Sequence, residues 1–565
     1  MRQAAPASPW EQLVVSALLG TARRPPPPEL VTPGPRAPLA LLDAAALRTV
    51  RRRAGLRPGP TAGERPAPAP EDSRPPLPEA ARERLARLLA DRSAPSGPGG
   101  RRGTAPDLTE LLPQWLSAAN ARGYQAPAPL LPALLEAGRA RTGLRAQVLL
   151  LAGPRGLWLA RLNPAWRYAL RAGSPAFLLP GAEAPEAVRR LWDEGLFAER
   201  AALLVSLRRH DPGAARALLE STWATERAED RLMFTDSLRT GLSAADEPFL
   251  ERALSDRSRT VRATAAELLS ALPESAFAAR MAARAVPCVA MDRTGCGEAV
   301  LVEAPHECDA ALQADGVVPH APSGRGERAW WFGQLVECAP LAVWPPRLGG
   351  RSAREIVALP VRDGWAEELH AAWCRAAVRQ RDVPWARALL GEPASPPSTG
   401  PGTTSQAERA ALLAVLPPGE RARWTGSFIA AHGLSEAFQL LGACEVPWAA
   451  PLGRAVVDAL DIARDAGSYP WSFSGVMGLA ERCLDPAAAR QLEALTAVPD
   501  EGEDASPGAG GYWSEAFRRL VSTLRLRAAM HEELSGSGSE TGGAGPAAVA
   551  ARQGRGAGTA DGRRA

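Results

Sequence analysis

The sequence predicts an all-α fold in which antiparallel helix pairs stack into an extended array. Three observations support this prediction. Apolar residues recur at helical spacing over most of the 565 residues, and no convincing alternating strand interrupts them. Between residues 184 and 285 the helices are short, carry broad apolar faces and are joined by tight turns. No single pair could bury such faces, so stacked pairs are expected.

The first expected helix spans residues 8–20 and carries clear signals at both ends. Ser8 and Glu11 form a capping box around Pro9, whose missing N–H costs nothing at a first helical position. Gly20 is suited to end the helix, and Pro25–Pro28 predicts a polyproline II exit. The apolar face contains Trp10, Leu13, Val14, Ala17 and Leu18. We expect this face to cap the chain's own helical array rather than to bind a partner.

Composition and periodicity divide the rest of the chain into helical regions and connecting segments. The expected order is N-terminal capping helices (1–56), a proline-rich linker (57–78), a helical region (79–180), stacked repeats (181–285), an irregular insertion (286–350), a helical pair (351–391), a second linker (392–406), a C-terminal helical region (407–534) and a disordered tail (535–565).

Amino-acid usage excludes several enzyme classes. All 66 basic residues are arginine, as a GC-rich coding sequence favours. A P-loop NTPase, a protein kinase and a Schiff-base enzyme each need a lysine, so none of these is expected. The net charge of +4 is small and the arginines are scattered among acids, which does not predict a nucleic-acid surface. Seven spread cysteines without a CxxC, and no signal peptide or membrane span, predict a reduced cytoplasmic chain.

One stretch of the array resembles a known helical repeat. Residues 254–273, LSDRSRTVRATAAELLSALP, are similar to the second half of a HEAT repeat, with Asp256 in the turn and Arg262 in the following helix. That resemblance implies that the aspartate and the arginine bridge neighbouring repeats. It makes the expected array a HEAT-like α-solenoid.

A wider resemblance covers most of the chain. The stretches that carry it are WEQLVVSALLGTARR, LLDAAALRTVRRR, GLWLARLNPAW, ERAALLVSLRRHDPGAARALLESTW, DEPFLERALSDRS, GRGERAWW and GWAEELHAAW. Together they resemble an uncharacterised bacterial domain-of-unknown-function family, number 5691. The resemblance implies HEAT-like helices and no established activity. It also implies a multi-protein system with a MoxR-type AAA ATPase, a von Willebrand A-domain protein and a SWIM zinc-finger protein as candidate partners.

Two motifs within residues 286–350 invite a chemical interpretation. Cys288, Cys296, His306 and Cys308 include metal-ligating residue types, but their spacing lacks the short pairs of structural zinc sites, and incidental buried thiols are favoured. GRGERA, residues 324–329, fits a loose dinucleotide fingerprint. That fingerprint needs a preceding strand, so a glycine-rich turn into a helix is the favoured interpretation.

A candidate partner surface lies directly after this turn. Trp330 and Trp331 are adjacent, and adjacent helix residues point about 100° apart. Either the helix is central and covered on two sides, which is favoured, or one tryptophan is an exposed anchor beside Arg325, Glu327 and Arg328.

The functional expectation is a non-catalytic scaffold or adaptor for protein–protein interactions. No catalytic, cofactor-binding or metal residue is assigned, no cofactor is expected, and neither membrane nor nucleic acid is an expected partner. The alternatives left open are a nucleic-acid-binding HEAT-like repeat protein, of which a base-modifying enzyme is one form, and, third, a metal-dependent enzyme that uses the 288–308 cluster.

Overall fold

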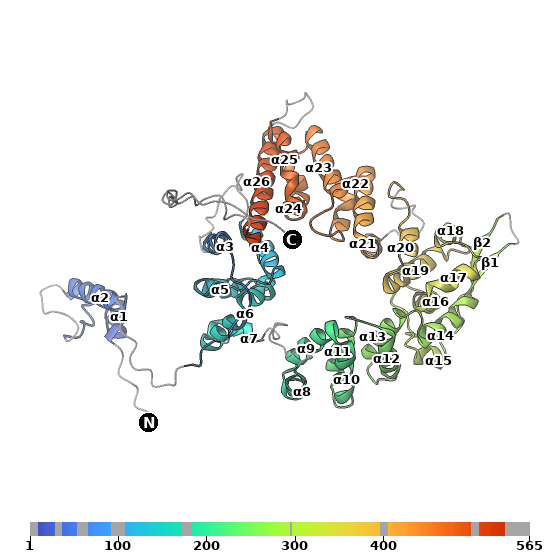
Figure 1. The fold of residues 1–565 in the computed structure, drawn as a ribbon, viewed down its shortest axis with the longest axis horizontal. Coiled ribbons are helices and arrows are strands. Elements are labelled where there is room, and N and C mark those ends of the chain that lie inside the picture. Colours follow the sequence, from blue (N-terminus) through green and yellow to red (C-terminus); the bar gives the residue numbers. More distant parts are fainter. Residues whose placement is uncertain are drawn as a thin grey trace, which may run out of the picture. The chain divides into compact units, whose positions relative to one another are not determined.

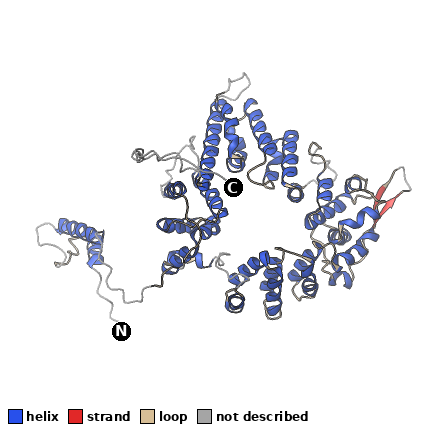
Figure 2. Cartoon of the chain, in the orientation of Figure 1, coloured by secondary structure: helices blue, strands red, loops and turns tan. Residues whose placement is uncertain are grey.

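The computed structural model shows an all-α protein, as the sequence predicts (Figures 1 and 2). The structure describes residues 9–28, 37–53, 66–69, 71–91, 108–171, 184–293, 297–395, 405–498 and 508–536. No helix in these ranges is long and apolar enough to cross a membrane. The predicted tail beyond residue 536 and Ser8 of the predicted capping box lie outside the described residues.

The first 69 residues form a compact unit of their own, which contains α1 (Pro9–Leu19) and α2 (Ala37–Arg53). Leu13 of α1 packs with Leu41 and Ala44 of α2. Gly20 follows α1 at φ +83°, so the predicted helix end is confirmed. Large apolar side chains remain exposed on both helices, with Leu18 the most exposed at 80%. That these helices cap the array stays a prediction.

Residues 70–565 form the second unit, and its first helices build a small core. These helices are α3 (Glu79–Asp91), α4 (Leu108–Ala121), α5 (Leu131–Ala140), α6 (Arg145–Leu162) and α7 (Tyr168–Arg171). Trp115, Leu134 and Leu151 are fully buried in this core. Gly153, at φ +61°, lies at a kink within α6.

Part of the predicted linker 57–78 belongs to this packed region instead. Leu77 is buried in its core, and the Pro75 carbonyl accepts a hydrogen bond of 3.0 Å from the backbone N–H of Gln125. Arg74 pairs with Asp72 at 2.7 Å and donates to the Leu150 carbonyl at 2.6 Å. Proline content predicted a solvated spacer, but proline carbonyls still accept hydrogen bonds, and those bonds fix residues 71–78 here.

The region predicted as stacked repeats, residues 181–285, consists of short helices that pack successively. Its helices are α8 (Pro185–Glu194), α9 (Phe197–His210), α10 (Pro212–Thr222), α11 (Ala228–Ser237), α12 (Glu247–Ala253), α13 (Arg259–Ser270) and α14 (Ala276–Ala285). Their apolar faces enter one large core that continues to residue 524. Packed helix pairs of this kind are compatible with an all-α solenoid.

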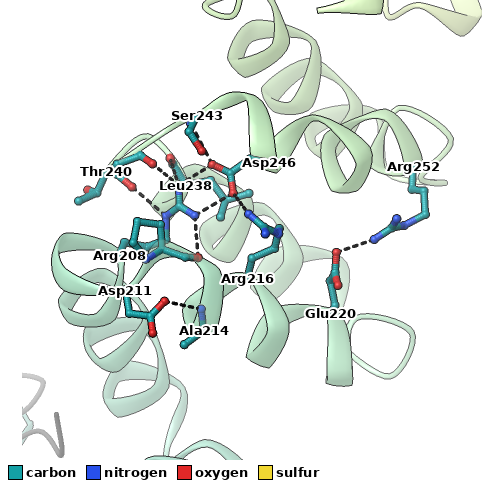
Figure 3. A network of polar contacts seen from close by, with 12 residues as sticks. Arg208, Asp211, Ala214, Arg216, Glu220, Leu238, Thr240, Ser243, Asp246 and Arg252 are labelled. Atoms are coloured by element: carbon teal, nitrogen blue, oxygen red, sulfur yellow. Dashed lines mark hydrogen bonds and ion pairs between the residues drawn. The ribbon is translucent and has the colours of Figure 1, made fainter. Parts of the chain in front are cut away.

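Buried ion pairs join neighbouring helices of this region (Figure 3). Arg208 of α9 and Asp246, just before α12, are both fully buried and lie 2.8 Å apart, and Arg216 also reaches Asp246 at 2.8 Å. Arg208 donates further hydrogen bonds to the carbonyls of Pro212, Leu238, Thr240 and Gly241. Asp256, the aspartate of the repeat-like stretch, pairs with Arg231 of α11 at 2.8 Å. These pairs fix the stacking because removing one partner would leave a buried charge unpaired.

Residues 286–350, predicted as an irregular insertion without strands, contain in their described part a two-stranded antiparallel sheet, three α-helices and two 3-10 helices. The sheet pairs β1 (Val289–Asp292) with β2 (Ala299–Val302). The helices are α15 (Ala310–Ala314), α16 (Glu327–Cys338) and α17 (Trp344–Arg347). The strand sequences VAMD and AVLV are almost wholly apolar and do not alternate, which explains why the sequence pattern missed them.

The remaining helices complete the large core. They are α18 (Ala353–Val357), α19 (Ala366–Gln380), α20 (Val383–Leu390), α21 (Gln406–Val415), α22 (Pro418–Leu441), α23 (Ala450–Asp465), α24 (Ser474–Cys483), α25 (Ala489–Leu492) and α26 (Ala509–Ser535). The last helix belongs to both cores of the second unit. Trp513 and Leu524 lie in the large core, while Met530 and Leu534 lie in the core of α3–α7.

Candidate partner groove

The two tryptophans of the candidate partner surface both pack against the protein's own core. Trp331 is only 8% exposed, and its Nε1 donates to the Pro319 carbonyl at 2.7 Å. Trp330 is half-buried against the large core. Helix α16 contacts α13, α14 and α19, so the favoured alternative of a covered central helix is what the structure shows.

The charged residues of the same predicted surface are engaged within the chain. Arg325 forms an ion pair with Glu368 and lies over the Trp330 ring at 5.0 Å. The hydrogen bond to Glu368 is the main cause that raises the pKa of Arg325 above its ordinary value. Arg328 donates to the Ala304 carbonyl at 2.5 Å, and Glu327 lies 3.7 Å from His320. Arg325 and Arg328 therefore both make contacts within the chain.

The structure also shows the surroundings of the other two sequence motifs, the glycine-rich segment 324–329 and the cysteine–histidine set within 288–308. Residues 324–326 lie in a turn that leads into α16, as the glycine-rich interpretation predicted, and the element before them is the helix α15 rather than a strand. The Cys288 thiol donates to the Arg284 carbonyl at 3.3 Å, and burial raises its pKa. Cys296 lies outside the described residues, and within the described ranges no three histidine, cysteine or acidic side chains gather as metal ligands would.

An exposed aromatic cluster lies elsewhere, between the 3-10 helix η8 (Pro470–Phe473) and the start of α26. The Tyr469 and Trp471 rings stack at 4.1 Å with an interplanar angle of 13°, and Tyr512 meets Trp471 edge-on at 5.3 Å. Trp471 is 54% exposed and Tyr512 is 51% exposed. Six tryptophans of this chain are buried almost completely, so an exposed one held by two neighbouring rings is a distinctive surface feature.

Local sequence explains why these rings point outward. The indole N–H of Trp513 donates to the Ser468 carbonyl at 2.6 Å, which ties the segment before η8 to α26. Trp513 is fully buried, and the helical rotation of about 100° per residue turns its neighbour Tyr512 to the surface. Pro470 starts η8 and places Trp471 directly beside Tyr512.

A groove extends from the aromatic cluster along the contact between α24 and α26. Its first part is a cavity of about 250 Å³ lined by Pro470, Trp471, Ser474, Met477, Gly478, Glu481, Tyr512, Glu515, Ala516 and Arg519. A neighbouring cavity of about 390 Å³ shares Ser474, Gly478, Glu481 and Arg519 and reaches Glu110 and Gln114 of α4. We call these two adjacent cavities, which share four lining residues, the aromatic groove. It has the concave form and mixed lining of a ligand site.

The aromatic groove contains one carboxylate that is held in an ion pair and a second that has no such partner among the described residues. Arg519 pairs with Glu481 at 2.8 Å, and both side chains are largely buried. Arg527 supports the end of α24 by donating to the Leu484 carbonyl at 2.6 Å, and burial lowers the pKa of Arg527. Glu515 lines the groove beside the aromatic cluster and has no ion-pair partner in the part of the chain that the structure describes.

A larger cavity of about 950 Å³ lies between α22 and α23. Its lining consists mainly of glycine, alanine and serine, with Arg423, Arg454 and Asp458 among them. It contains one aromatic ring, Phe473, apart from His432. Because small side chains provide few contacts for recognition, the aromatic groove is the stronger candidate site.

Comparison with known proteins identifies the chain's family. Residues 12–534 match the model described as "Family of unknown function (DUF5691)". The chain belongs to this family. No curated protein and no solved structure is detectably similar to it. The range matched to DUF5691 includes every residue that lines the aromatic groove.

Sequence reasoning missed the groove residues of this DUF5691 chain. The available signal was the pair Tyr512–Trp513, where the same two-sided argument that was applied to Trp330–Trp331 predicts one exposed ring. A second signal was the segment SYPWSF, residues 468–473, which gathers three aromatic side chains at a turn. Their meeting with α26 depends on tertiary structure.

Proposed function

We propose that this protein is a non-catalytic helical scaffold that holds an extended segment of a partner protein in the aromatic groove. The observation that carries the proposal is the half-exposed Trp471, which stacks on Tyr469 and borders a cavity. Tryptophan, tyrosine and arginine beside a pocket are the residues that dominate binding energy at protein interfaces. The groove lies in a packed part of the chain and so offers a preformed surface.

The proposed setting is a cytoplasmic multi-protein system. The partner to test first is a MoxR-type AAA ATPase, followed by a von Willebrand A-domain protein and a SWIM zinc-finger protein. The proposal needs no cofactor and no catalytic residue, since binding alone performs the function.

Charge at the groove favours a protein partner over a nucleic acid. Exposed aromatic rings could stack on bases, but Glu515, Glu481 and Glu110 line the same groove. Glu481 is paired with Arg519 and Glu110 with Arg141, so Glu515 is the carboxylate that would repel a phosphate backbone.

The proposal is tested by affinity purification of the tagged full chain from its native lysate after nuclease treatment. We expect stoichiometric recovery of one of the three candidate partners with the wild-type chain and its loss with Trp471→Ala. Met233→Ala is the matched control, because Met233 is also an exposed large apolar residue, at 54%, but lies on α11 away from the groove.

Two outcomes contradict the proposal. Partner recovery that is equal for wild type and Trp471→Ala would remove the groove from the interaction. Recovery of nucleic acid without any protein partner, when nuclease is omitted, would replace the scaffold with a nucleic-acid-binding function.

A further inference from the structure

We propose that the aromatic groove recognises a proline-rich segment of a partner protein in the polyproline II conformation, with an arginine next to the prolines. This inference rests on the proposed function and assigns the chemistry of the segment that the groove holds. Three features carry it: the arrangement of the rings, a carboxylate beside them that has no ion-pair partner among the described residues, and the length of the groove.

The ring arrangement suits proline. Tyr469 and Trp471 stack face to face, and Tyr512 meets Trp471 at 69°, so the cluster presents two ring orientations within 5.3 Å of each other. Proline side chains are flat, apolar and fixed, and they pack on the exposed surfaces of aromatic rings with little loss of conformational entropy. Pro470 and Met477 add further apolar lining to the same cavity.

The carboxylate beside the rings suits an arginine. Glu515 is one helical turn from Tyr512 on α26 and lines the same cavity, and it has no ion-pair partner among the described residues. Glu481 is already paired with Arg519, so it is not available to a ligand. A guanidinium next to the bound prolines could form a charge-assisted pair with Glu515.

The groove is long enough for an extended segment rather than a single side chain. The two cavities share four lining residues and continue from Trp471 on η8 to Glu110 on α4. A polyproline II segment rises about 3.1 Å per residue and leaves its backbone groups free for partners such as Gln114 and Ser474.

The test is fluorescence anisotropy of the full-length chain with a labelled peptide of two arginines followed by five prolines. One control peptide replaces the prolines with alanines, and a second replaces the arginines with glutamines. We expect the alanine peptide to bind at least about tenfold more weakly, because it lacks the preformed conformation.

Variants assign the binding to individual groove residues. Trp471→Ala and, independently, Tyr512→Ala should each weaken the arginine–proline peptide on the order of tenfold. Glu515→Gln should weaken that peptide about threefold to tenfold and leave the glutamine peptide unchanged. Met233→Ala should bind every peptide as the wild type does.

The outcomes separate this inference from the proposed function. No peptide binding, or equal binding of the alanine peptide, overturns the inference, and the scaffold proposal survives only if Trp471→Ala still abolishes partner recovery. If partner recovery is also independent of Trp471, both proposals fail. Self-association in sedimentation that Trp471→Ala abolishes would overturn the assignment to a partner, since Arg23–Pro28 of a second copy has the same chemistry.

Discussion

Helix α16 and the start of α26 both carry adjacent aromatic residues beside arginine and glutamate, yet only one of them forms a surface. At α16, Trp331 is buried, Trp330 is half-buried, and Arg325 is paired with Glu368. At α26, Trp513 is buried, whereas Tyr512 is exposed together with Trp471, and Glu515 is unpaired among the described residues. The difference is coverage: α16 is packed by three helices, while the start of α26 borders a groove. Composition therefore does not identify an interaction site unless the local contacts are known.

The largest expected effect is a loss of stability at α16, the covered helix. Trp331→Ala should lower the free energy of unfolding by about 3–5 kcal/mol, because it opens a cavity and removes the donor to Pro319. Urea unfolding followed by circular dichroism measures the effect, and Trp331→Phe should lose less. A Trp331→Ala variant as stable as the wild type would show that α16 is not covered as described.

Acid should also destabilise this packed region, because α19, which contacts α16, contains the partly buried His370. Burial lowers the pKa of His370, which stacks on Trp373 in α19, from 6.5 to about 4. Between these values the unfolded chain binds a proton that the folded chain does not, so the free energy of unfolding falls as the pH falls from about 6.5 to 4. Urea midpoints across this range measure the loss. His370→Phe keeps the ring and should flatten the profile; an unchanged profile would assign the loss to other groups.

A smaller effect, a gain in stability, is expected at the aromatic groove. Gly478 lies within α24, and an added Cβ would meet only the flexible Arg482 side chain, at 3.6 Å. Gly478→Ala should therefore raise the free energy of unfolding by about 0.4–1 kcal/mol, since alanine has less conformational freedom to lose. The same methyl group narrows both cavities, so partner recovery should fall while stability rises. A loss of stability would mean that the floor of the groove is packed more tightly than the structure shows.

A last expected effect mirrors the first. Trp471→Ala should lower the free energy of unfolding by only about 0.5–1.5 kcal/mol, because the side chain is half-exposed and loses its contacts with Tyr469 and Tyr512. The unfolding midpoint, compared with that of Met233→Ala, checks this. A loss as large as that of Trp331→Ala would remove the distinction between the two regions and make Trp471 a structural residue.

Helical spacing in the sequence was sufficient to predict the all-α fold, because the apolar residues of helices such as α9 and α13 enter the core at regular intervals. It did not predict that residues 71–78 pack, since their hydrogen bonds use carbonyls that carry no sequence signature. The sequence also offered Trp330 and Trp331 as candidate surface residues. It could not show that α13, α14 and α19 pack against α16, because these contacts join helices that are distant in the sequence. The groove was missed for the same reason: Trp471 and Tyr512 meet only after folding.

The double membership of α26 has a consequence for synthesis of the chain. Arg84 of α3 pairs with Glu533 of α26 at 2.6 Å, and the Tyr124 hydroxyl donates to the Leu534 carbonyl at 2.8 Å. These partners are separated by more than 400 positions. At a translation rate of about 5–20 residues per second, roughly 20–90 s pass between the synthesis of α3 and the synthesis of its partner residues at the end of α26. During that interval the apolar faces that later receive Met530 and Leu534 are open to chaperones, so completion of this nascent core is a late event of biogenesis.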